Sequence, residues 1–291
     1  MLLWLVTAIA VFGVACFLYG VLIEHKAYRL VERPRLPILP AQAPGPLTLL
    51  HLSDLHCVAG DERKARFVAG LPRADVTVVT GDFLAEPEAV ETAVAAVRAA
   101  RGRLASYFVL GSNDIYVPRP FSPLRYLFKA RTRPKGRRSR TYDLIELLRA
   151  DGWTFLCNDR VDGTLGTLPV EVVGLNDPHI HREDLRVAER SDDSRFGLAI
   201  VHSPDPAPEL AALGWNLVLA GHTHGGQVRA PWGPLVNNSS LPLRITDGLF
   251  RMGTGWLHIS RGLGTSKYAP FRFLCRPQAE LLELVPGPSG A

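Results

Sequence analysis

An α/β domain preceded by one transmembrane helix is the fold class that this 291-residue sequence predicts. Three observations predict it: an apolar N-terminus without charged side chains, an alternation of strand-like and helix-like segments, and polar turns at the strand ends. The chain is long enough to bury a substantial core. Its hydrophobic content of 47% and charged content of 21% fit a folded globular protein with an added apolar segment.

The N-terminal segment 1–23 has the length of a membrane anchor. It contains no charged side chain and would extend about 34 Å as a helix, more than the ~30 Å core of a bilayer. A cleaved signal peptide is the alternative, but no lysine or arginine precedes the apolar run, as a signal peptide requires. Four cations follow the run, namely Lys26, Arg29, Arg33 and Arg35. By the positive-inside bias they predict a single-pass protein of the cell membrane whose following domain lies in the cytoplasm.

Segment 24–46 is basic and rich in proline. Its five prolines are Pro34, Pro37, Pro40, Pro44 and Pro46. Proline disfavours helices and the interior of sheets, so we expect a semi-rigid, extended linker between the anchor and the domain.

The rest of the chain, 47–285, predicts the α/β domain. Helices are predicted at 61–69, 87–100 and 142–150. Strands are predicted at 47–52, 76–80, 106–110, 154–157, 170–175, 197–201, 217–220, 256–260, 271–275 and 280–285. In such α/β folds, sites form where strands end, so the polar turns at the carboxyl ends are the expected site. The last residues, 286–291, predict a disordered tail.

The basic insertion, 118–140, carries most of the positive charge. Between positions 125 and 140 eight cations occur without an acid: Arg125, Lys129, Arg131, Arg133, Lys135, Arg137, Arg138 and Arg140. The net charge of +5 would be −3 without these eight, so no stable nucleic-acid partner is expected. The four cysteines form no Cys-x-x-Cys pair and predict neither a disulfide framework nor a zinc knuckle. We expect a monomer.

Side chains that can bind metals follow five of the predicted strands. They are Asp54 and His56, Asp82, Asn113 with Asp114, His202, and His222 with His224. In the last of these stretches, 219–227, an apolar strand ends in Gly-His-Thr-His-Gly-Gly-Gln. Neutral imidazole is a common metal ligand, and the adjoining glycines let a ligand approach the backbone. Strand-terminal Asp and Asn also form ordinary turns, but five such ends in one chain predict a shared metal site.

The order of these motifs resembles that of the calcineurin-like metallophosphoesterases, in which Asp-x-His, Gly-Asp, Gly-Asn-His-Asp/Glu, His and Gly-His-x-His follow one another. The resemblance covers about 47–284. The longer Gly-His-Thr-His-Gly-Gly-Gln stretch, Ser260-Arg261-Gly262-Leu263-Gly264 and the region of Arg272 and Pro277 are similar to the membrane-associated bacterial branch. That branch includes phosphodiesterases related to UDP-2,3-diacylglucosamine pyrophosphatases.

Membership would imply a four-layer αββα sandwich of the metallo-dependent phosphatase type and a centre for two divalent metal ions. It implies that Asp54, His56 and His224 hold one metal and that Asn113, His202 and His222 hold the other. Asp82 would bridge the two. Two such ions clamp the attacking and leaving oxygens of an in-line displacement at phosphorus and generate a bridging hydroxide. Nitrogen and oxygen ligands without cysteine suit Mn, Fe or Zn.

The third motif departs from the family pattern, because it reads Gly111-Ser112-Asn113-Asp114. Aligned on the glycine, Ser112 takes the asparagine position; aligned on the ligand, Asn113 keeps it and Asp114 replaces the histidine. We prefer the second alignment, because an amide oxygen binds metals better than a neutral hydroxyl. Asn113 and Asp114 are therefore the candidate catalytic residues. Asp114 could act as a general acid only if its pKa were raised.

Together these features predict a membrane-anchored, dinuclear metal-dependent phosphohydrolase. A phosphodiesterase or pyrophosphatase acting on a phosphorylated amphiphile is the preferred reading, with Arg125, Lys129 and Arg131 of the basic insertion binding substrate near the bilayer. A nucleotide or nucleic-acid phosphodiesterase and a metal-binding scaffold without turnover are the alternatives. Four other histidines are left out of the predicted site, namely His51, His179, His181 and His258.

Overall fold

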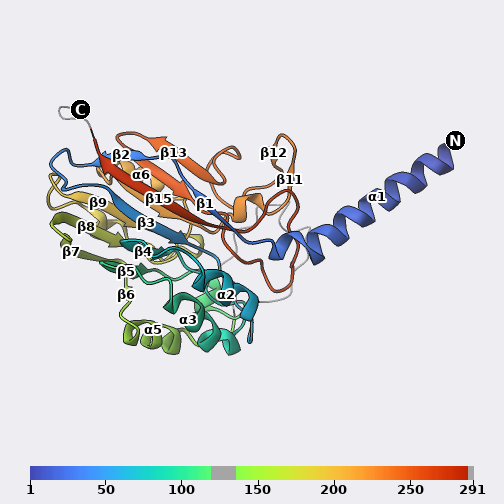
Figure 1. The fold of residues 1–291 in the computed structure, drawn as a ribbon, viewed down its shortest axis with the longest axis horizontal. Helices are drawn as coiled ribbons and strands as arrows, with labels where there is room; N and C mark the ends of the chain where they lie inside the picture. The colour runs from blue at the N-terminus through green and yellow to red at the C-terminus, as the bar shows by residue number, and fades with distance from the viewer. Residues whose placement is uncertain (119–135, 288–291) are drawn as a thin grey trace.

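Two mixed β-sheets form the centre of the protein in the computed structural model, which describes residues 1–118 and 136–287 (Figure 1). The first sheet has the strand order β1-β15-β3-β4-β5-β6, with β2 also paired to β15. Its strands are β1 (Arg29–Glu32), β2 (Leu36–Leu39), β3 (Leu47–Leu52), β4 (Val76–Val79), β5 (Ala105–Phe108), β6 (Thr154–Phe155) and β15 (Gln278–Pro286). Strands β3 to β6 are parallel to one another, and β15 runs antiparallel to β3.

The second sheet has the order β13-β14-β10-β9-β8-β7. Its strands are β7 (Asp159–Leu165), β8 (Leu168–Gly174), β9 (Phe196–Ile200), β10 (Leu217–Ala220), β13 (Gly248–Met252) and β14 (Gly255–Ile259). The four central strands β8, β9, β10 and β14 are parallel. A separate hairpin joins β11 (Arg229–Ala230) to β12 (Gly233–Pro234).

Apolar side chains on both faces of the strands create three buried cores. One core lies between the two sheets and includes Leu49, Val78 and Leu219. Another packs the first sheet against α2 (Glu62–Ala69), α3 (Val90–Arg98) and α5 (Thr141–Ala150), which cover its outer face (Figure 1). The third packs the second sheet against α6 (Ala207–Ala212). Strands buried on both faces read as continuous apolar runs, which explains why they could be located from the sequence.

Most predicted elements agree with the structure to within a few residues, but several differ. Strands β7 and β13 and helix α6 were not predicted. The strand predicted at 271–275 is wrong: within it, only Phe273 forms an isolated bridge, to Val228. Short helical turns complete the chain, namely η1 (Glu24–Lys26), η2 (Pro87–Ala89), α4 (Ser112–Ile115), η4 (Pro178–Ile180), η5 (Leu185–Ala188) and η6 (His224–Gly226). All four cysteines are free.

The expected spacer at 24–46 differs most from the structure, because β1 and β2 lie within it and pair with β15. Leu36 and Leu39 are buried, whereas Pro37 between them is exposed. Proline is compatible with this position because β1 and β2 form the edge of the sheet, where a missing amide donor costs no ladder bond. The segment is therefore part of the folded domain. The predicted tail, 286–291, begins inside β15, and 288–291 lie outside the described residues.

Helix α1 (Leu2–Leu22) projects away from the two sheets (Figure 1). It is long and apolar enough to cross a membrane, a test that a signal sequence near an N-terminus also passes. Its last turns contact the domain, since the ring of Phe17 stacks on Phe271 at 5.6 Å between centroids and Tyr19 lies 6.4 Å from Phe273. A Cβ on Gly20 would be 2.2 Å from the Phe271 ring, so glycine permits this close packing.

A buried carboxylate completes this junction. Glu24 is 1% exposed, and its side chain accepts hydrogen bonds from the backbone N–H groups of Leu274, at 3.0 Å, and Cys275. A buried N–H that loses its acceptor costs about 1–3 kcal/mol. Glu24 therefore fixes the loop 271–275 against the base of α1.

We expect Glu24→Ala to lower the free energy of unfolding of the full-length protein in detergent by about 2 kcal/mol, because two buried N–H groups lose their acceptor. Chemical denaturation followed by circular dichroism measures this. The exposed Glu32, on β1, provides the control, and Glu32→Ala should stay within ~0.5 kcal/mol of the wild type. Equal stability of the two variants would contradict the role assigned to Glu24.

Candidate metal centre

The loops after five strands bring the predicted metal ligands together between the carboxyl ends of the two sheets. The first sheet provides Asp54 and His56 after β3, Asp82 after β4 and Asn113 after β5; the second provides His202 after β9 and His222 and His224 after β10. Among the described residues, two groups have ligand atoms within 4.8 Å of one another: Asp54, His56 and His224, and Asp54, Asp82 and His202.

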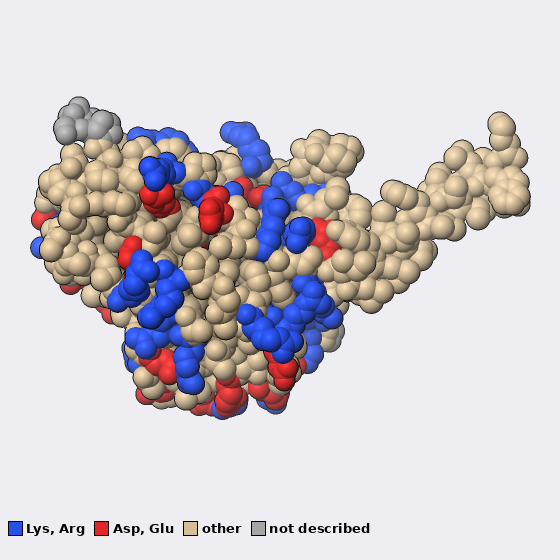
Figure 2. All heavy atoms as spheres, in the orientation of Figure 1, with Lys and Arg blue, Asp and Glu red and all other residues tan. Residues whose placement is uncertain are grey.

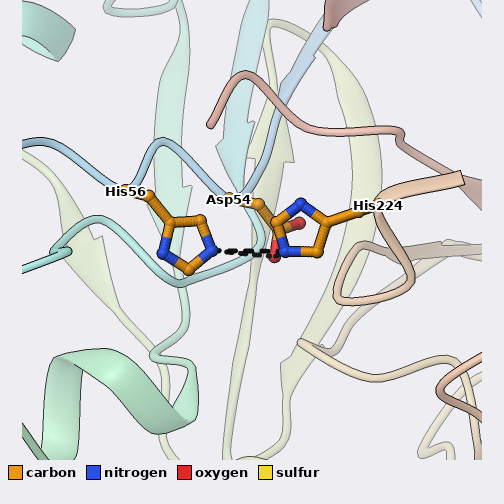
Figure 3. Close-up of side chains that lie close together, drawn as sticks. All are labelled: Asp54, His56 and His224. Carbon is orange, nitrogen blue, oxygen red and sulfur yellow. Dashed lines mark hydrogen bonds and ion pairs between the residues drawn. The ribbon is translucent and has the colours of Figure 1, made fainter. Parts of the chain in front are cut away.

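The first group converges from both sheets onto one point, as Figure 3 shows. The Nε2 atoms of His56 and His224 are 3.3 Å apart. The Oδ1 atom of Asp54 lies 3.5 Å from Nε2 of His224 and 3.9 Å from Nε2 of His56. Three donor atoms that face one another at this spacing are arranged as the ligands of a single ion would be.

Asp82 connects this group with the second one. Its Oδ2 atom lies 3.5 Å from Nε2 of His56 and 3.6 Å from Nε2 of His202. Nε2 of His202 is in turn 3.2 Å from Nδ1 of His222. The Asp82 carboxylate therefore faces both groups of imidazoles at once.

Asn113 adjoins the same carboxylate. Its backbone N–H donates to Oδ1 of Asp82 at 2.9 Å, and its amide Nδ2 donates to Oδ2 at 2.5 Å. The structure thus brings Asn113 to the cluster, and its role as a metal ligand stays a prediction. Asp114, the neighbouring residue, is fully buried and directed elsewhere: its carboxylate accepts from the N–H groups of Leu84, at 3.1 Å, and Gly111, at 3.0 Å.

Burial raises the pKa of Asp114 to about 8, and the charge of Asp82 adds to this effect. The side chain is therefore protonated at neutral pH, as a general acid requires, although its hydrogen bonds to Leu84 and Gly111 hold it at the start of α4. A catalytic role for Asp114 stays a prediction. The predicted substrate-binding residues Arg125, Lys129 and Arg131 lie outside the described residues.

The backbone of the site adopts conformations that most residues avoid. Five of the seven predicted ligands have positive φ angles between 44° and 68°, namely Asp54, His56, Asp82, His222 and His224. Such left-handed conformations are uncommon outside glycine and tend to occur at functional sites. Two glycines leave the space that this crowding needs, because a Cβ on Gly221 would lie 1.8 Å from Oγ of Ser53 and one on Gly111 would lie 2.2 Å from Oδ1 of Asp82.

Burial controls the protonation of the imidazoles. Burial, followed by the neighbouring His224, lowers the pKa of His56 well below its usual value, and burial lowers the pKa of His224 to about 4. Both rings are neutral at pH 7, the form that binds a metal. His202 differs, because burial opposes its charge but Asp82 and then Asp177 raise its pKa to about 9. When no metal is bound, a proton on His202 supplies a positive charge beside Asp82.

Backbone carbonyls orient two of the rings toward the cluster. Nδ1 of His202 lies 2.7 Å from the carbonyl oxygen of Thr80, and Nδ1 of His224 lies 3.3 Å from that of Gly264. A carbonyl oxygen only accepts, so Nδ1 of His202 carries a proton and its Nε2 is the nitrogen that faces the cluster. Nδ1 of His224 also lies 3.3 Å from a guanidinium nitrogen of Arg272, which only donates, so its two neighbours favour opposite tautomers. Such outer partners fix the ring orientation of metal-binding histidines.

Two residues near the site were missed by the sequence analysis. The amide Nδ2 of Asn238 lies 3.0 Å from Nε2 of His222, and the ring of His179 lies 4.2 Å from that of His222. The sequence gives no sign of Asn238, which lies in an irregular loop. His179 follows the turn Asn176-Asp177-Pro178, and its place near other histidines depends on the arrangement of β8 and β10. By contrast, His51 and His258, also left out of the predicted site, hydrogen-bond to each other in the core at 2.8 Å.

The residues present fit a metal centre. Oδ2 of Asp54 accepts from Oγ of Ser53, at 2.5 Å, and from the N–H of His222, at 2.9 Å. Its Oδ1 is buried, faces His56 and His224, and has no hydrogen-bond partner among the residues that the structure describes. A buried carboxylate oxygen of this kind is costly unless a cation satisfies it. Carboxylate and neutral imidazole are donors that suit divalent Mn, Fe and Zn.

Comparison with known proteins agrees with this site. Residues 47–226 match the family model of the calcineurin-like phosphoesterases. The chain is 32% identical over 117 residues to the metallophosphoesterase YkuE of Bacillus subtilis and 31% identical over 167 residues to the phosphodiesterase YaeI of Escherichia coli. These matches cover 40% and 56% of this chain, and they span 40% and 59% of the length of the two relatives. It is also 25% identical over 276 residues to the UDP-2,3-diacylglucosamine pyrophosphatase LpxG of Chlamydia trachomatis, which covers 79% of this chain and 81% of that protein.

The substitution Gly221→Ala tests the packing of the site. Its Cβ would overlap Ser53 and come within 2.5 Å of Oδ2 of Asp54, so the first group of ligands must move apart. Mn²⁺ at about 100 times its Kd should stabilise the wild type by about 2.7 kcal/mol, which appears as a rise in Tm. We expect G221A to lose this rise.

The control is Gly163→Ala on β7, where nothing lies within 4 Å of an added Cβ. This variant should keep the Mn²⁺-dependent rise in Tm. A full rise in G221A would show that the metal does not bind beside Asp54.

Proposed function

Because this chain belongs to the calcineurin-like phosphoesterases and is a metal-dependent phosphoesterase, we propose that it is a membrane-anchored phosphodiesterase or pyrophosphatase with two metal ions. The observation that carries the proposal is the position of the Asp82 carboxylate, which faces His56 on one side and His202 on the other. One carboxylate between two groups of ligands is what a bridged pair of ions requires.

In this proposal each metal has its own ligands. Asp54, His56 and His224 would hold one ion, Asn113, His202 and His222 would hold the other, and Asp82 would contact both. When bound, the metals would activate water and neutralise charge on the phosphoryl oxygens. Manganese, iron and zinc all suit this donor set.

The chain's own residues then have defined tasks. The carbonyl of Thr80 holds the ring of His202 with Nε2 toward the cluster, and the carbonyl of Gly264 and the guanidinium of Arg272 position the ring of His224. Asn113 holds the carboxylate of Asp82 through two hydrogen bonds. Asp114 accepts from the N–H groups of Leu84 and Gly111, and a role as proton donor to the leaving oxygen would require its carboxyl, whose pKa burial raises to about 8, to turn toward the metals.

The substrate is proposed to be a phosphorylated amphiphile of the membrane. The support is the junction between α1 and the domain: Phe17 and Tyr19 pack on the loop 271–273, and the buried Glu24 binds the same loop. Removal of α1 as a signal sequence would expose these contacts, so we propose that α1 is kept as a single-pass anchor with the domain in the cytoplasm. The names of two relatives, a phosphodiesterase and a pyrophosphatase of a diacylated sugar nucleotide, agree with such a substrate.

Hydrolysis of bis-p-nitrophenyl phosphate tests the reaction. The full-length, Mn²⁺-loaded protein should hydrolyse this diester, and His202→Ala should lower kcat/KM at least ~100-fold because one metal loses a ligand. Asp114→Asn should lower kcat for a diester with a poor leaving group by about 10²-fold, the lower range for general acid catalysis. Two bound metals without hydrolysis of any ester would favour the scaffold reading, and faster hydrolysis of nucleotide diesters would favour the nucleotide reading.

The role of the basic insertion is tested with a triple variant. Replacing Arg125, Lys129 and Arg131 by glutamine should raise KM for a diacyl phosphodiester in mixed micelles about 100-fold, because cations near an anionic surface contribute about 1 kcal/mol each and about 1.4 kcal/mol is a factor of ten. A control variant, Arg251→Gln on β13, should leave KM unchanged. If the triple variant keeps the wild-type KM, these three residues do not bind substrate.

A further inference from the structure

A cavity of about 470 Å³ lies beside the metal ligands, between the base of α1 and the start of α2. Its walls include the residues directly after α1, the ligand loop 56–60, the N-terminal turn of α2 and the loop 263–270. The residues that matter here are Lys26, Tyr28, His56, Arg63, Gly264 and Thr265. Its volume is in the range of small-molecule sites, about 300–1,000 Å³.

The cavity adjoins the proposed metal centre. His56, one of the ligands of the first group, forms part of its wall. So does Gly264, whose carbonyl oxygen lies 3.3 Å from Nδ1 of His224. A molecule with a phosphoryl group at the metals could therefore extend into the cavity past His56.

The opposite wall belongs to the membrane-proximal part of the chain. Lys26 and Tyr28 line it, and they follow directly on the apolar helix Leu2–Leu22. The Tyr28 ring packs on Phe67 of α2 at 5.4 Å between centroids, which fixes this wall to the domain. The cavity is thus the space between the metal ligands and the base of α1.

The walls of the cavity carry an excess of positive charge. The other nearby cations have partners: Lys64 pairs with Asp61 at 2.8 Å, and Lys267 pairs with Glu86. The acidic Glu62, also on the wall, pairs with Arg66 at 2.8 Å. Lys26 and Arg63 are exposed, and neither side chain forms an ion pair with residues 1–118 or 136–287. Figure 2 shows lysine and arginine side chains gathered over this face, below the base of α1.

We propose that this cavity binds a second anionic group, such as another phosphate, of an amphiphilic substrate whose acyl chains remain beside α1. The inference rests on the proposed function, which it makes more specific. Lys26 and Arg63 supply the charge that recognises the anion, and the position between α1 and His56 gives the direction in which the substrate enters. The scissile phosphorus lies at the metals, and the second anion lies toward the bilayer.

Binding to the metal-free protein tests this without hydrolysis. The full-length protein in neutral detergent is treated with a chelator, and dihexanoyl phosphatidic acid is titrated by calorimetry, with inorganic phosphate as the second probe. We expect the phosphatidic acid to bind and inorganic phosphate to bind at least ~10-fold more weakly. The double variant Lys26→Gln/Arg63→Gln should raise the Kd of the phosphatidic acid about tenfold, since each cation near such a ligand contributes modestly to the binding free energy.

Arg73→Gln is the matched control, because Arg73 is an exposed cation that does not line the cavity. It should leave the Kd unchanged. The proposal is overturned if the double variant binds as tightly as the wild type, or if Arg73→Gln weakens binding equally, which would indicate a diffuse surface effect. If the protein does not hydrolyse bis-p-nitrophenyl phosphate, the proposed function is contradicted. The binding experiment still tests the anion site, because it does not depend on hydrolysis.

Discussion

Two buried carboxylates, Asp54 and Asp82, impose the constraint on which the rest of this structure depends. Both are removed from water at the edge where the two sheets meet, and they face the imidazoles of His56, His202 and His224. Burying two negative charges this close is unfavourable unless a positive charge lies between them. The proton on His202 supplies part of that charge, and divalent cations would supply it fully. The ligand loops have a strained, left-handed backbone, and the surrounding sheets must keep them in this conformation.

Arg272 connects the loops that hold the metal ligands with the N-terminal helix. Its guanidinium is fully buried and donates to the carbonyl oxygens of Gly264, at 2.6 Å, and Arg261, at 2.8 Å. Gly264 lies against the first ligand loop, where its N–H donates to the carbonyl of Asp54. The loop that contains Arg272 also receives Phe17 and Glu24 from the base of α1. The metal ligands and the base of α1 are therefore attached to one continuous loop rather than joined by a spacer, which supports the proposal that the substrate enters from the side of α1.

The sequence was most informative where local pattern and topology agree. Apolar runs ending in Asp, Asn or His identified β3, β4, β5, β9 and β10, and parallel strands of a sheet necessarily end at the same edge. Prediction failed where a long-range contact decides the outcome. The prolines of 24–46 indicated a spacer, but pairing with β15, more than 200 residues away, made β1 and β2 edge strands. The apolar residues around Arg272 suggested a strand, whereas the buried guanidinium, bonded to carbonyls of other loops, holds irregular backbone there. Asn238 could not be found because its contact with His222 follows from the fold alone.

Anomalous diffraction from crystals of the Mn²⁺-loaded protein tests the central claim most directly. We expect two anomalous peaks about 3.5–4 Å apart, one beside Asp54, His56 and His224, the other beside Asn113, His202 and His222, with the carboxylate of Asp82 between them. A single peak, or peaks remote from Asp82, would contradict it.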